Sequence, residues 1–261
     1  MISFCVTIYN TSKTLDNFFN SFNGLSIEYE IVIVDNYSKD GTKEYFRKLK
    51  NDHVKFFQEK CNRGEGRNIA INKSLGDYII MLDADIKYNK LHEIIDQSLD
   101  SQNNNLLNHF WSGVVGVNIT SAYKEIFLKL DLYPPINCYE DGYIWLLASN
   151  LKILNNINIP VDYADNIKID KLSDTISEWR YSRGYYEYLK RWIEKSADII
   201  FVKNQDYSAF MKFNKVDSFR KILLSIFLYI TGKIYSKLFI RIPTVEEKTR
   251  EIKDNFNISI N

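Results

Sequence analysis

Short apolar runs alternate with amphipathic segments along the first half of the chain. Nearly unbroken apolar runs over 2–8, 29–34 and 78–82, and a shorter one over 54–57, have the length and composition of buried strands. Between them, residues 15–22 repeat apolar side chains at helical spacing, and 42–49 and 62–75 are also predicted as helices. Strands alternating with helices predict an α/β fold with a mostly parallel sheet.

The second half of the chain is less regular. Its apolar spacing predicts a helix beginning at Leu91, a strand over 113–119, a helix over 122–130, and strand and turn over 153–161. A long aromatic helix is predicted from Asp174 to about 195, and we expect the charged end beyond Thr244 to be mobile. We place a boundary near Ala197, which gives an α/β domain over 1–196 and a helical extension over 197–261.

Composition narrows the class of protein. The 261 residues carry a net charge of +1, which argues against nucleic acid as a partner, and 45% of them are hydrophobic, which excludes a disordered chain. Cys5, Cys61 and Cys138 are odd in number and form no C-x-x-C pair, so we expect a reducing compartment and no zinc site. No signal peptide is visible after Met1, so we expect a cytoplasmic protein.

Two carboxylates follow the strand predicted over 78–82. Asp83 and Asp85 are separated by one residue, Ala84, so in extended backbone they point the same way. Such a pair repels itself unless a cation is nearby, and hard cations such as Mg²⁺ or Mn²⁺ take carboxylate and phosphate oxygens. An isolated Asp-x-Asp is more often a pair of solvated loop acids, so its neighbours decide the interpretation.

Further polar pieces follow strands or open helices at the same predicted edge of the sheet. They are Thr7-Ile8-Tyr9-Asn10, Ile33-Val34-Asp35-Asn36 and Arg67-Asn68, and Glu140-Asp141 comes later in the chain. Together with the Asp-x-Asp, this set over about 2–154 resembles the family 2 glycosyltransferases, which have the GT-A fold. The resemblance includes the Ser-x-Asp-Gly-Thr turn that begins at Ser38.

The resemblance implies a nucleotide-sugar donor site. Asp85, with Asp83, is expected to hold Mn²⁺ or Mg²⁺, and Arg67 is expected to pair with the pyrophosphate or the base. Many relatives carry a second acid where this chain has Asn36. An amide can donate as well as accept a hydrogen bond, so the resemblance does not fix the base as uracil. The donor-binding residues expected from the resemblance are Thr7, Tyr9, Asn10, Asp35, Asn36, Arg67, Asp83 and Ala84.

The resemblance makes Asp141 the general base for an inverting displacement. It would take the proton from a hydroxyl of a saccharide or lipid-linked acceptor, and Glu140 would hold the acceptor or orient the base. Without the resemblance, Glu-Asp ahead of a helix is simply a favourable interaction with the helix dipole.

The segment 218–241 is strongly apolar and contains basic residues but no acid. Lys233 and Lys237 interrupt the run too early for a spanning helix, so we expect a basic amphipathic helix at a membrane surface, on the cytoplasmic face. The alternative is a helix docked on the α/β domain or on a partner chain.

Three other functions share parts of this sequence pattern. A polyprenyl-phosphate sugar synthase has the same fold, but its anionic acceptor needs no base, which the Glu140-Asp141 pair argues against. A receiver-like phosphate-switch domain needs a Lys at a later strand end, and no suitable Lys follows the predicted strand over 113–119. A non-catalytic nucleotide-sugar-binding protein would not need the complete set of acids.

Overall fold

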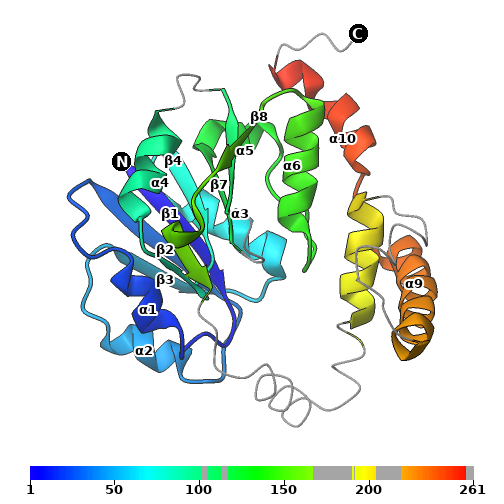
Figure 1. Ribbon diagram of the computed structural model, residues 1–261, viewed down its shortest axis with the longest axis horizontal. Coiled ribbons are helices and arrows are strands. Elements are labelled where there is room, and N and C mark those ends of the chain that lie inside the picture. Colours follow the sequence, from blue (N-terminus) through cyan, green and yellow to red (C-terminus); the bar gives the residue numbers. More distant parts are fainter. Residues whose placement is uncertain (101–104, 113–116, 167–189, 191, 204–218, 257–261) are drawn as a thin grey trace.

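A seven-stranded sheet organises the molecule (Figure 1). The computed structural model describes residues 1–100, 105–112, 117–166, 190, 192–203 and 219–256. Strand order is β3-β2-β1-β4-β7-β6-β8, and β7 is antiparallel to both of its neighbours while the other pairs are parallel. The strands are β1 Ile2–Ile8, β2 Tyr29–Asp35, β3 Val54–Gln58, β4 Tyr78–Leu82, β6 Leu107–Trp111, β7 Asn118–Tyr123 and β8 Leu154–Asn158.

Helices cover both faces of the sheet, because the central strands are apolar on both sides. Along β2, Ile31 and Ile33 face one hydrophobic core, while Val32 and Val34 face the other. The first core is closed by α1 Leu15–Asn20, α2 Thr42–Lys48 and α4 Leu91–Leu99. The second is closed by α3 Arg63–Lys73, α5 Lys124–Lys129 and α6 Glu140–Asn150. The mostly parallel α/β fold predicted from the sequence is confirmed.

The antiparallel strand differs from its prediction. We expected a strand over 113–119 and a helix from 122, but β7 runs Asn118–Tyr123 and α5 begins at Lys124. The cause is pairing with β4, in which Ile79 lies opposite Ala122 and Tyr78 opposite Tyr123. This pairing extends the strand into residues that we had assigned to the following helix. Strand β6 was not predicted, because its sequence mixes Asn108 and His109 with apolar residues. Residues 113–116 lie outside the described part of the chain.

A second, two-stranded sheet lies directly after the Asp-x-Asp. Strand β5, Ile86–Tyr88, pairs antiparallel with β9, Ala164–Asn166, which follows the short helix η1, Val161–Tyr163. The buried Tyr88 accepts a hydrogen bond at its hydroxyl from the backbone N–H of Asp83, at 2.9 Å. This small sheet therefore anchors the chain as it leaves the two carboxylates.

The described residues of the carboxyl-terminal part are mostly helical and lie beside the sheet domain (Figure 1). Residues 192–203 are helical and pack against α9, Phe219–Phe239. The charged end that we expected to be mobile instead forms α10, Val245–Ile252, followed by η2, Lys253–Phe256. Thr244 caps α10 in a capping box with Glu247, and Val245 and Ile252 are buried in the second core.

The predicted boundary at Ala197 lies within the helix over 192–203, so the division into two domains stays a prediction. The predicted helix from Asp174 falls largely within 167–189, outside the described residues.

Candidate functional site

A pocket of about 740 Å³ opens at the carboxyl ends of β1, β2 and β4. Parallel strands gather their following loops at this edge, which is where open α/β sheets bind ligands. Seven of the predicted site residues line it, namely Thr7, Tyr9, Asn10, Asn36, Asp83, Ala84 and Asp85. Among the other lining residues, four are basic, namely Lys39, Lys60, Arg63 and Lys190.

The loops after β1 and β2 hold each other in place. Asn10 has a left-handed backbone, with φ 54°, and its backbone N–H donates to Ser38 Oγ at 2.7 Å. Its side-chain Oδ1 accepts from the backbone N–H of Lys39 at 2.9 Å. Asn36 Oδ1 accepts from the backbone N–H of Cys61 at 3.3 Å, which ties the end of β2 to the start of α3. These amides shape the pocket wall as well as line it.

Asp35 lies behind the wall rather than in it. Its carboxylate is fully buried and accepts hydrogen bonds from the backbone and hydroxyl of Ser38 and from Gln58 Nε2, the last at 2.9 Å. The resemblance implied that Asp35 binds the donor directly. In this structure its oxygens accept hydrogen bonds from the turn that places Tyr37 and Lys39 in the pocket lining, and direct donor binding by Asp35 stays a prediction.

Helix α3 brings its first turn to the pocket. Asn62 caps the helix in a capping box with Glu65, which directs the chain into the helix immediately after the lining residue Cys61. Gly66 allows a close approach to β1, since a Cβ there would lie 2.8 Å from Thr7 Cγ2. At Gly64 a Cβ would lie 1.9 Å from the carbonyl oxygen of Pro134, so this turn also fits tightly against the loop before α6.

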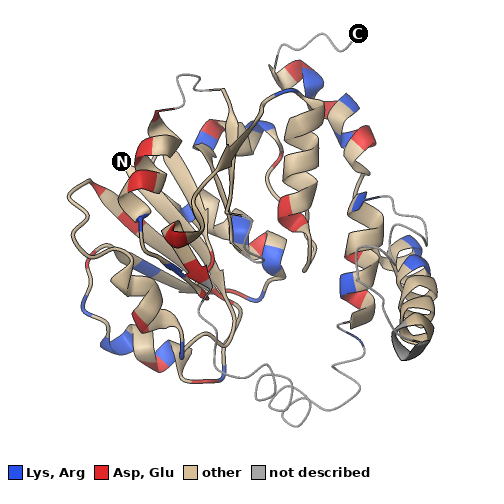
Figure 2. Ribbon diagram, viewed as in Figure 1, with Lys and Arg blue, Asp and Glu red and all other residues tan. Residues whose placement is uncertain are grey.

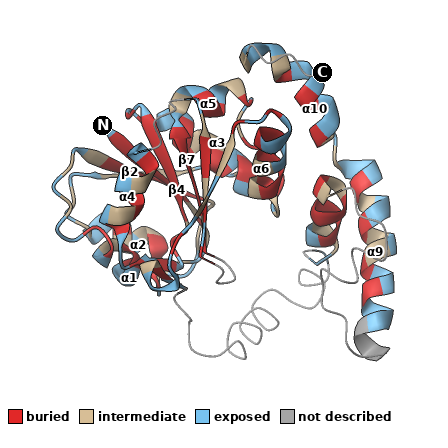
Figure 3. Cartoon of the chain, turned by 45° about the horizontal axis from the view of Figure 1, so that its top comes forward, coloured by how far each residue is buried: buried red, intermediate tan, exposed pale blue. Residues whose placement is uncertain are grey.

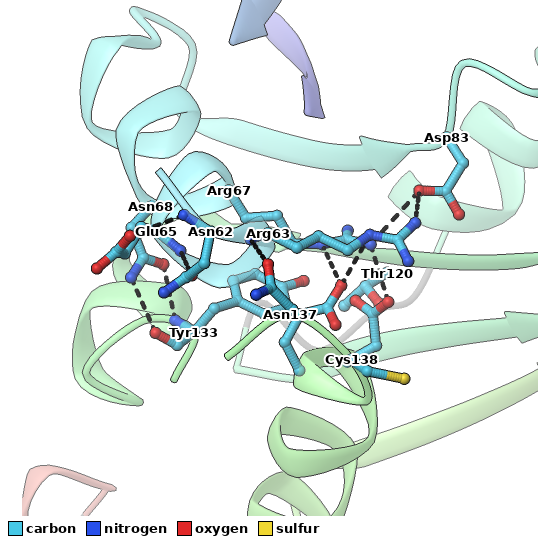
Figure 4. A network of polar contacts seen from close by, with 12 residues as sticks. Asn62, Arg63, Glu65, Arg67, Asn68, Asp83, Thr120, Tyr133, Asn137 and Cys138 are labelled. Carbon is cyan, nitrogen blue, oxygen red and sulfur yellow. Dashed lines mark hydrogen bonds and ion pairs between the residues drawn. The ribbon is translucent and has the colours of Figure 1, made fainter. Parts of the chain in front are cut away.

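Arg67 is the centre of a buried charge network (Figure 4). Its side chain is 3% exposed, and Nε donates to Glu140 Oε1 at 3.1 Å. Its Nη2 lies 2.9 Å from Asp141 Oδ2 and 3.5 Å from Asp83 Oδ1. Burial alone would lower the pKa of Arg67, but these three carboxylates hold it well above its ordinary value. The expected donor-binding arginine thus lies beneath the pocket and connects its acids.

Arg63, rather than Arg67, is the arginine of α3 that lines the pocket. Its side chain is 45% exposed and lines the pocket, with Nη2 3.0 Å from Asp83 Oδ1 and Nε 3.1 Å from Glu140 Oε1. Sequence reasoning missed it, and the available signal was its place as the first residue after the cap of α3. Figure 2 shows basic positions at the start of α3 and acidic positions at the start of α6 on the same side of the sheet.

Two carboxylate oxygens in this network have no hydrogen-bond partner among the described residues. They are Oε2 of Glu140 and Oδ1 of Asp141, and both are buried. Burial raises the pKa of Asp141 from its ordinary value of 3.8 to about 7, with Arg67 opposing the rise and Glu140 adding to it. Asp141 is therefore a carboxyl group with one paired oxygen, one unpaired oxygen and a pKa near neutrality, as a general base needs.

The two acids of the Asp-x-Asp pair have different environments. Asp83 is paired with two arginines, whereas Asp85 has no ion-pair partner among the described residues. Desolvation within the pocket and then the charge of Asp83 raise the pKa of Asp85. A divalent cation would relieve both effects.

The described residues contain no cluster of three His, Cys, Asp or Glu that could hold a metal. The carboxylates of Asp83 and Asp85 therefore suit a hard cation whose remaining ligands are substrate phosphates, rather than a cation held by protein side chains alone.

Part of this chain matches a known protein family. Residues 3–121 match the family model described as glycosyl transferase family 2. Abequosyltransferase RfbV of Salmonella typhimurium is 34% identical over 111 residues, which cover 39% of this chain. The match spans only 33% of that relative's own length.

Solved structures share the fold. Residues 1–349 of TarS from S. aureus, in complex with UDP, superpose with a TM-score of 0.53 over 98% of this chain and 91% of that one, at 14% identity. A mannosyltransferase from Pyrobaculum calidifontis, in complex with GDP-Man and Mn²⁺, gives a TM-score of 0.55 at 12% identity, covering 98% of this chain and 79% of that one. The expected GT-A fold is confirmed.

The antiparallel β7 and the order of the strands in the sheet exclude a receiver-like domain. Residues 3–121, somewhat less than half of the chain, thus match glycosyl transferase family 2.

Proposed function

We propose that this protein is a glycosyltransferase that moves a sugar from a nucleoside-diphosphate sugar to a hydroxyl of a saccharide or lipid-linked acceptor, with inversion. One observation carries the proposal. The same atom, Nη2 of Arg67, lies 3.5 Å from Asp83 and 2.9 Å from Asp141. The acid at the donor pocket and the candidate base are thus neighbours, as a direct displacement between donor and acceptor requires.

The pocket lining suits the base and the diphosphate of a nucleotide-sugar. Tyr9, at the end of β1, offers a ring face to the base, and Asn36 offers amide groups beside it. Lys39, Lys60 and Arg63 bring positive charge to the region that a diphosphate would occupy. Arg63 is already held by Asp83 and Glu140, so it is positioned before the donor arrives.

The chemistry follows from Asp141. Its unpaired Oδ1 takes the proton of the acceptor hydroxyl while the hydroxyl oxygen attacks the anomeric carbon and the bond from that carbon to the diphosphate breaks. Arg67 holds the other oxygen and so fixes the direction of the carboxylate. One displacement at the anomeric carbon inverts its configuration.

Asp85 and Asp83 would hold Mn²⁺ or Mg²⁺. A cation bound there supplies positive charge for the departing nucleoside diphosphate. The solved mannosyltransferase of the same fold that contains GDP-Man and Mn²⁺ supports the use of a divalent cation.

A membrane surface on the cytoplasmic side is the second part of the proposal. Helix α9 buries Leu228 together with three small residues, Ser225, Gly232 and Ser236, and turns most of its other large apolar side chains outward. Figure 3 shows exposed positions along the outer side of α9. Helices in water bury their large apolar residues, whereas close packing through small residues is usual in lipid. Residues Ile222–Phe239 are by length and composition alone apolar enough to cross a bilayer, but Lys233 and Lys237 lie within them, so we propose that α9 lies along the membrane surface.

The experiment that tests the donor site is binding of UDP, GDP and CDP, with and without MnCl₂, followed by thermal shift. We expect one nucleotide with Mn²⁺ to stabilise the wild type, by about 2.7 kcal/mol at a hundredfold excess over its dissociation constant. Asp85→Ala should abolish the Mn²⁺-dependent part. Asp77→Ala, an exposed acid at the opposite end of β4, is the matched control and should behave as the wild type. Equal stabilisation of Asp85→Ala and wild type would remove Asp85 from the metal site.

A further inference from the structure

The segment 134–139 leads directly into the two acids at the start of α6. On one side it contacts α3, because the backbone N–H of Gly64 donates to the carbonyl of Ile136 at 3.0 Å. The backbone N–H of Arg63 also donates to Asn137 Oδ1, at 3.3 Å. The first turn of α3, which carries a pocket arginine, therefore fixes one side of this segment.

Asp198 holds the other side. It lies on the helix over 192–203, and its Oδ2 accepts hydrogen bonds from the backbone N–H groups of Asn137, at 3.2 Å, and Cys138, at 3.0 Å. The Asp198 side chain is buried, with 6% of the residue exposed. A carboxylate is an expensive group to bury unless it is hydrogen-bonded, so this contact is specific rather than incidental.

The same helix makes a second contact with this segment. The ammonium group of Lys203 lies 4.7 Å from the centre of the Tyr139 ring, on the residue immediately before Glu140. Tyr139 itself has a left-handed backbone, with φ 66°. Its ring lies against Gly142, where a Cβ would come within 2.3 Å of it. The path from residue 137 into α6 therefore has little freedom, and a shift at 137–138 is transmitted to Glu140 and Asp141.

We propose that Asp198 is a positioning residue for sugar transfer, which sets the place of Glu140 and Asp141 by anchoring the backbone at Asn137 and Cys138. This inference rests on the proposed function, since it takes Asp141 as the base. It also gives the helix over 192–203, which lies outside the part that matches the family, a role in the reaction. Lys190 and Glu194 of the same region line the donor pocket, so one segment touches both halves of the site.

Three variants test the proposal. Asp198→Ala removes the acceptor, while Asp198→Asn keeps an oxygen that can accept both backbone hydrogen bonds. Ser196→Ala is the matched control, because Ser196 is equally buried on the same helix but donates to the carbonyl of Trp192, within the helix. The first measurement is amide hydrogen exchange of residues 137 and 138. The second is release of UDP or GDP from UDP-glucose, UDP-N-acetylglucosamine and GDP-mannose with MnCl₂ and water as acceptor, analysed as kcat and donor KM.

For Asp198→Ala we expect faster exchange at 137 and 138 and a kcat about 10²-fold lower, as for a displacement of about 1 Å in a catalytic group. Its donor KM should stay within about threefold of the wild-type value. The substitution is not expected to remove an interaction that is equally strong in the ground state and in the transition state. Asp198→Asn should recover both properties, and Ser196→Ala should change neither.

Unchanged exchange in Asp198→Ala would overturn the anchor, and faster exchange with unchanged kcat would overturn the positioning role. A wild type that turns over none of these donors would overturn the proposed function and the positioning role with it, while the exchange data would still decide the anchor. A loss of kcat that Asp198→Asn does not recover would also contradict the proposal.

Discussion

The Nη2 atom of Arg67 lies 2.9 Å from Oδ2 of Asp141, deep beneath the donor pocket. The candidate base is therefore one arm of an ion-pair network rather than an isolated acid. The network joins the first turn of α3, the first turn of α6 and the loop after β4, so the stability of the domain and the alignment of its acids depend on the same side chain.

Replacing Arg67 by Met should lower the free energy of unfolding by about 3–5 kcal/mol, because three carboxylates then face one another without their buried partner. Urea denaturation measures this change. Arg47→Met is the control, since Arg47 pairs with Glu44 on the surface at 4.0 Å and should contribute less than about 1 kcal/mol. A similar small effect for both variants would mean that the buried network does not hold the domain together.

Asp141→Asn should keep nucleotide binding and lose catalysis. The amide preserves the shape of the side chain but cannot take a proton, so we expect a chemical rate lower by about 10²-fold or more. Calorimetric titration with the nucleotide and single-turnover kinetics separate the two steps. Asp96→Asn on α4, an exposed acid that does not line the pocket, serves as control. Transfer at the wild-type rate by Asp141→Asn would place the base elsewhere or indicate an acceptor that is already anionic.

Asp198 should make stability depend on pH. Burial raises the pKa of this carboxyl from its ordinary value of 3.8 to about 7, although two backbone N–H groups partly oppose the rise. Between these values the folded state retains a proton that the unfolded state has released, so the contribution of Asp198 is complete below pH 4 and is lost as the pH rises to 7.

The quantity to measure is the free energy of unfolding of wild type minus that of Asp198→Asn, at steps from pH 4 to pH 8. We expect it to fall by roughly 2–4 kcal/mol across this range, since each tenfold change in proton affinity is worth about 1.4 kcal/mol. A difference that is flat with pH, or that rises, would contradict a raised pKa.

Gly64→Ala should be destabilising even though alanine favours helices. A Cβ at this position would lie 1.9 Å from the carbonyl oxygen of Pro134, and backbone on one side must move. We expect a loss of about 1–3 kcal/mol in thermal or urea unfolding. Asn72→Ala, exposed on the same helix, should be neutral or slightly stabilising. If Gly64→Ala matched it, the contact between α3 and the loop before α6 would not be close in solution.

The outer face of α9 should bind anionic liposomes. Leu223, Phe227, Ile230 and Ile234 lie on one side of the helix and are each between 43% and 54% exposed. Changing all four to Gln should reduce the sedimenting fraction by about tenfold or more, since each buried apolar side chain is worth about 1 kcal/mol or more. The control is Leu75→Gln, at a residue that is 70% exposed on the sheet domain. Equal sedimentation of the fourfold variant and wild type would contradict a membrane role for α9.

Most of the correct predictions came from strong local patterns in the sequence. The strands β1, β2 and β4 are uniformly apolar, and the residues that follow them line the pocket where parallel strands end. Strand β6 and helix α10 were missed because both depend on long-range contacts. The capping box at Thr244 and Glu247 was the one local sign of α10.

Sequence patterns could not predict the ion-pair network around Arg67. Spacing could bring Arg67 to the correct edge of the sheet, but whether Arg63 or Arg67 faces the pocket depends on how α3 rotates against β1. That rotation is fixed by Gly66 against Thr7 and Gly64 against Pro134, which are packing contacts between distant parts of the chain. For the same reason, Asp35 could be placed at the strand end but not turned toward Ser38 and Gln58.

Helix α10 returns to α6 from about a hundred residues further along the chain. Tyr143 Oη donates to the carbonyl of Pro243 at 2.9 Å, and Lys248 Nζ lies 2.6 Å from Asp131 Oδ2. A ribosome adds ~5–20 residues per second, so α6 emerges roughly 5–20 s before the segment that covers it. During that interval the apolar side of the helix that carries Glu140 and Asp141 has no cover on this flank. Chaperone binding to nascent chains should therefore be strongest between the synthesis of α6 and that of α10.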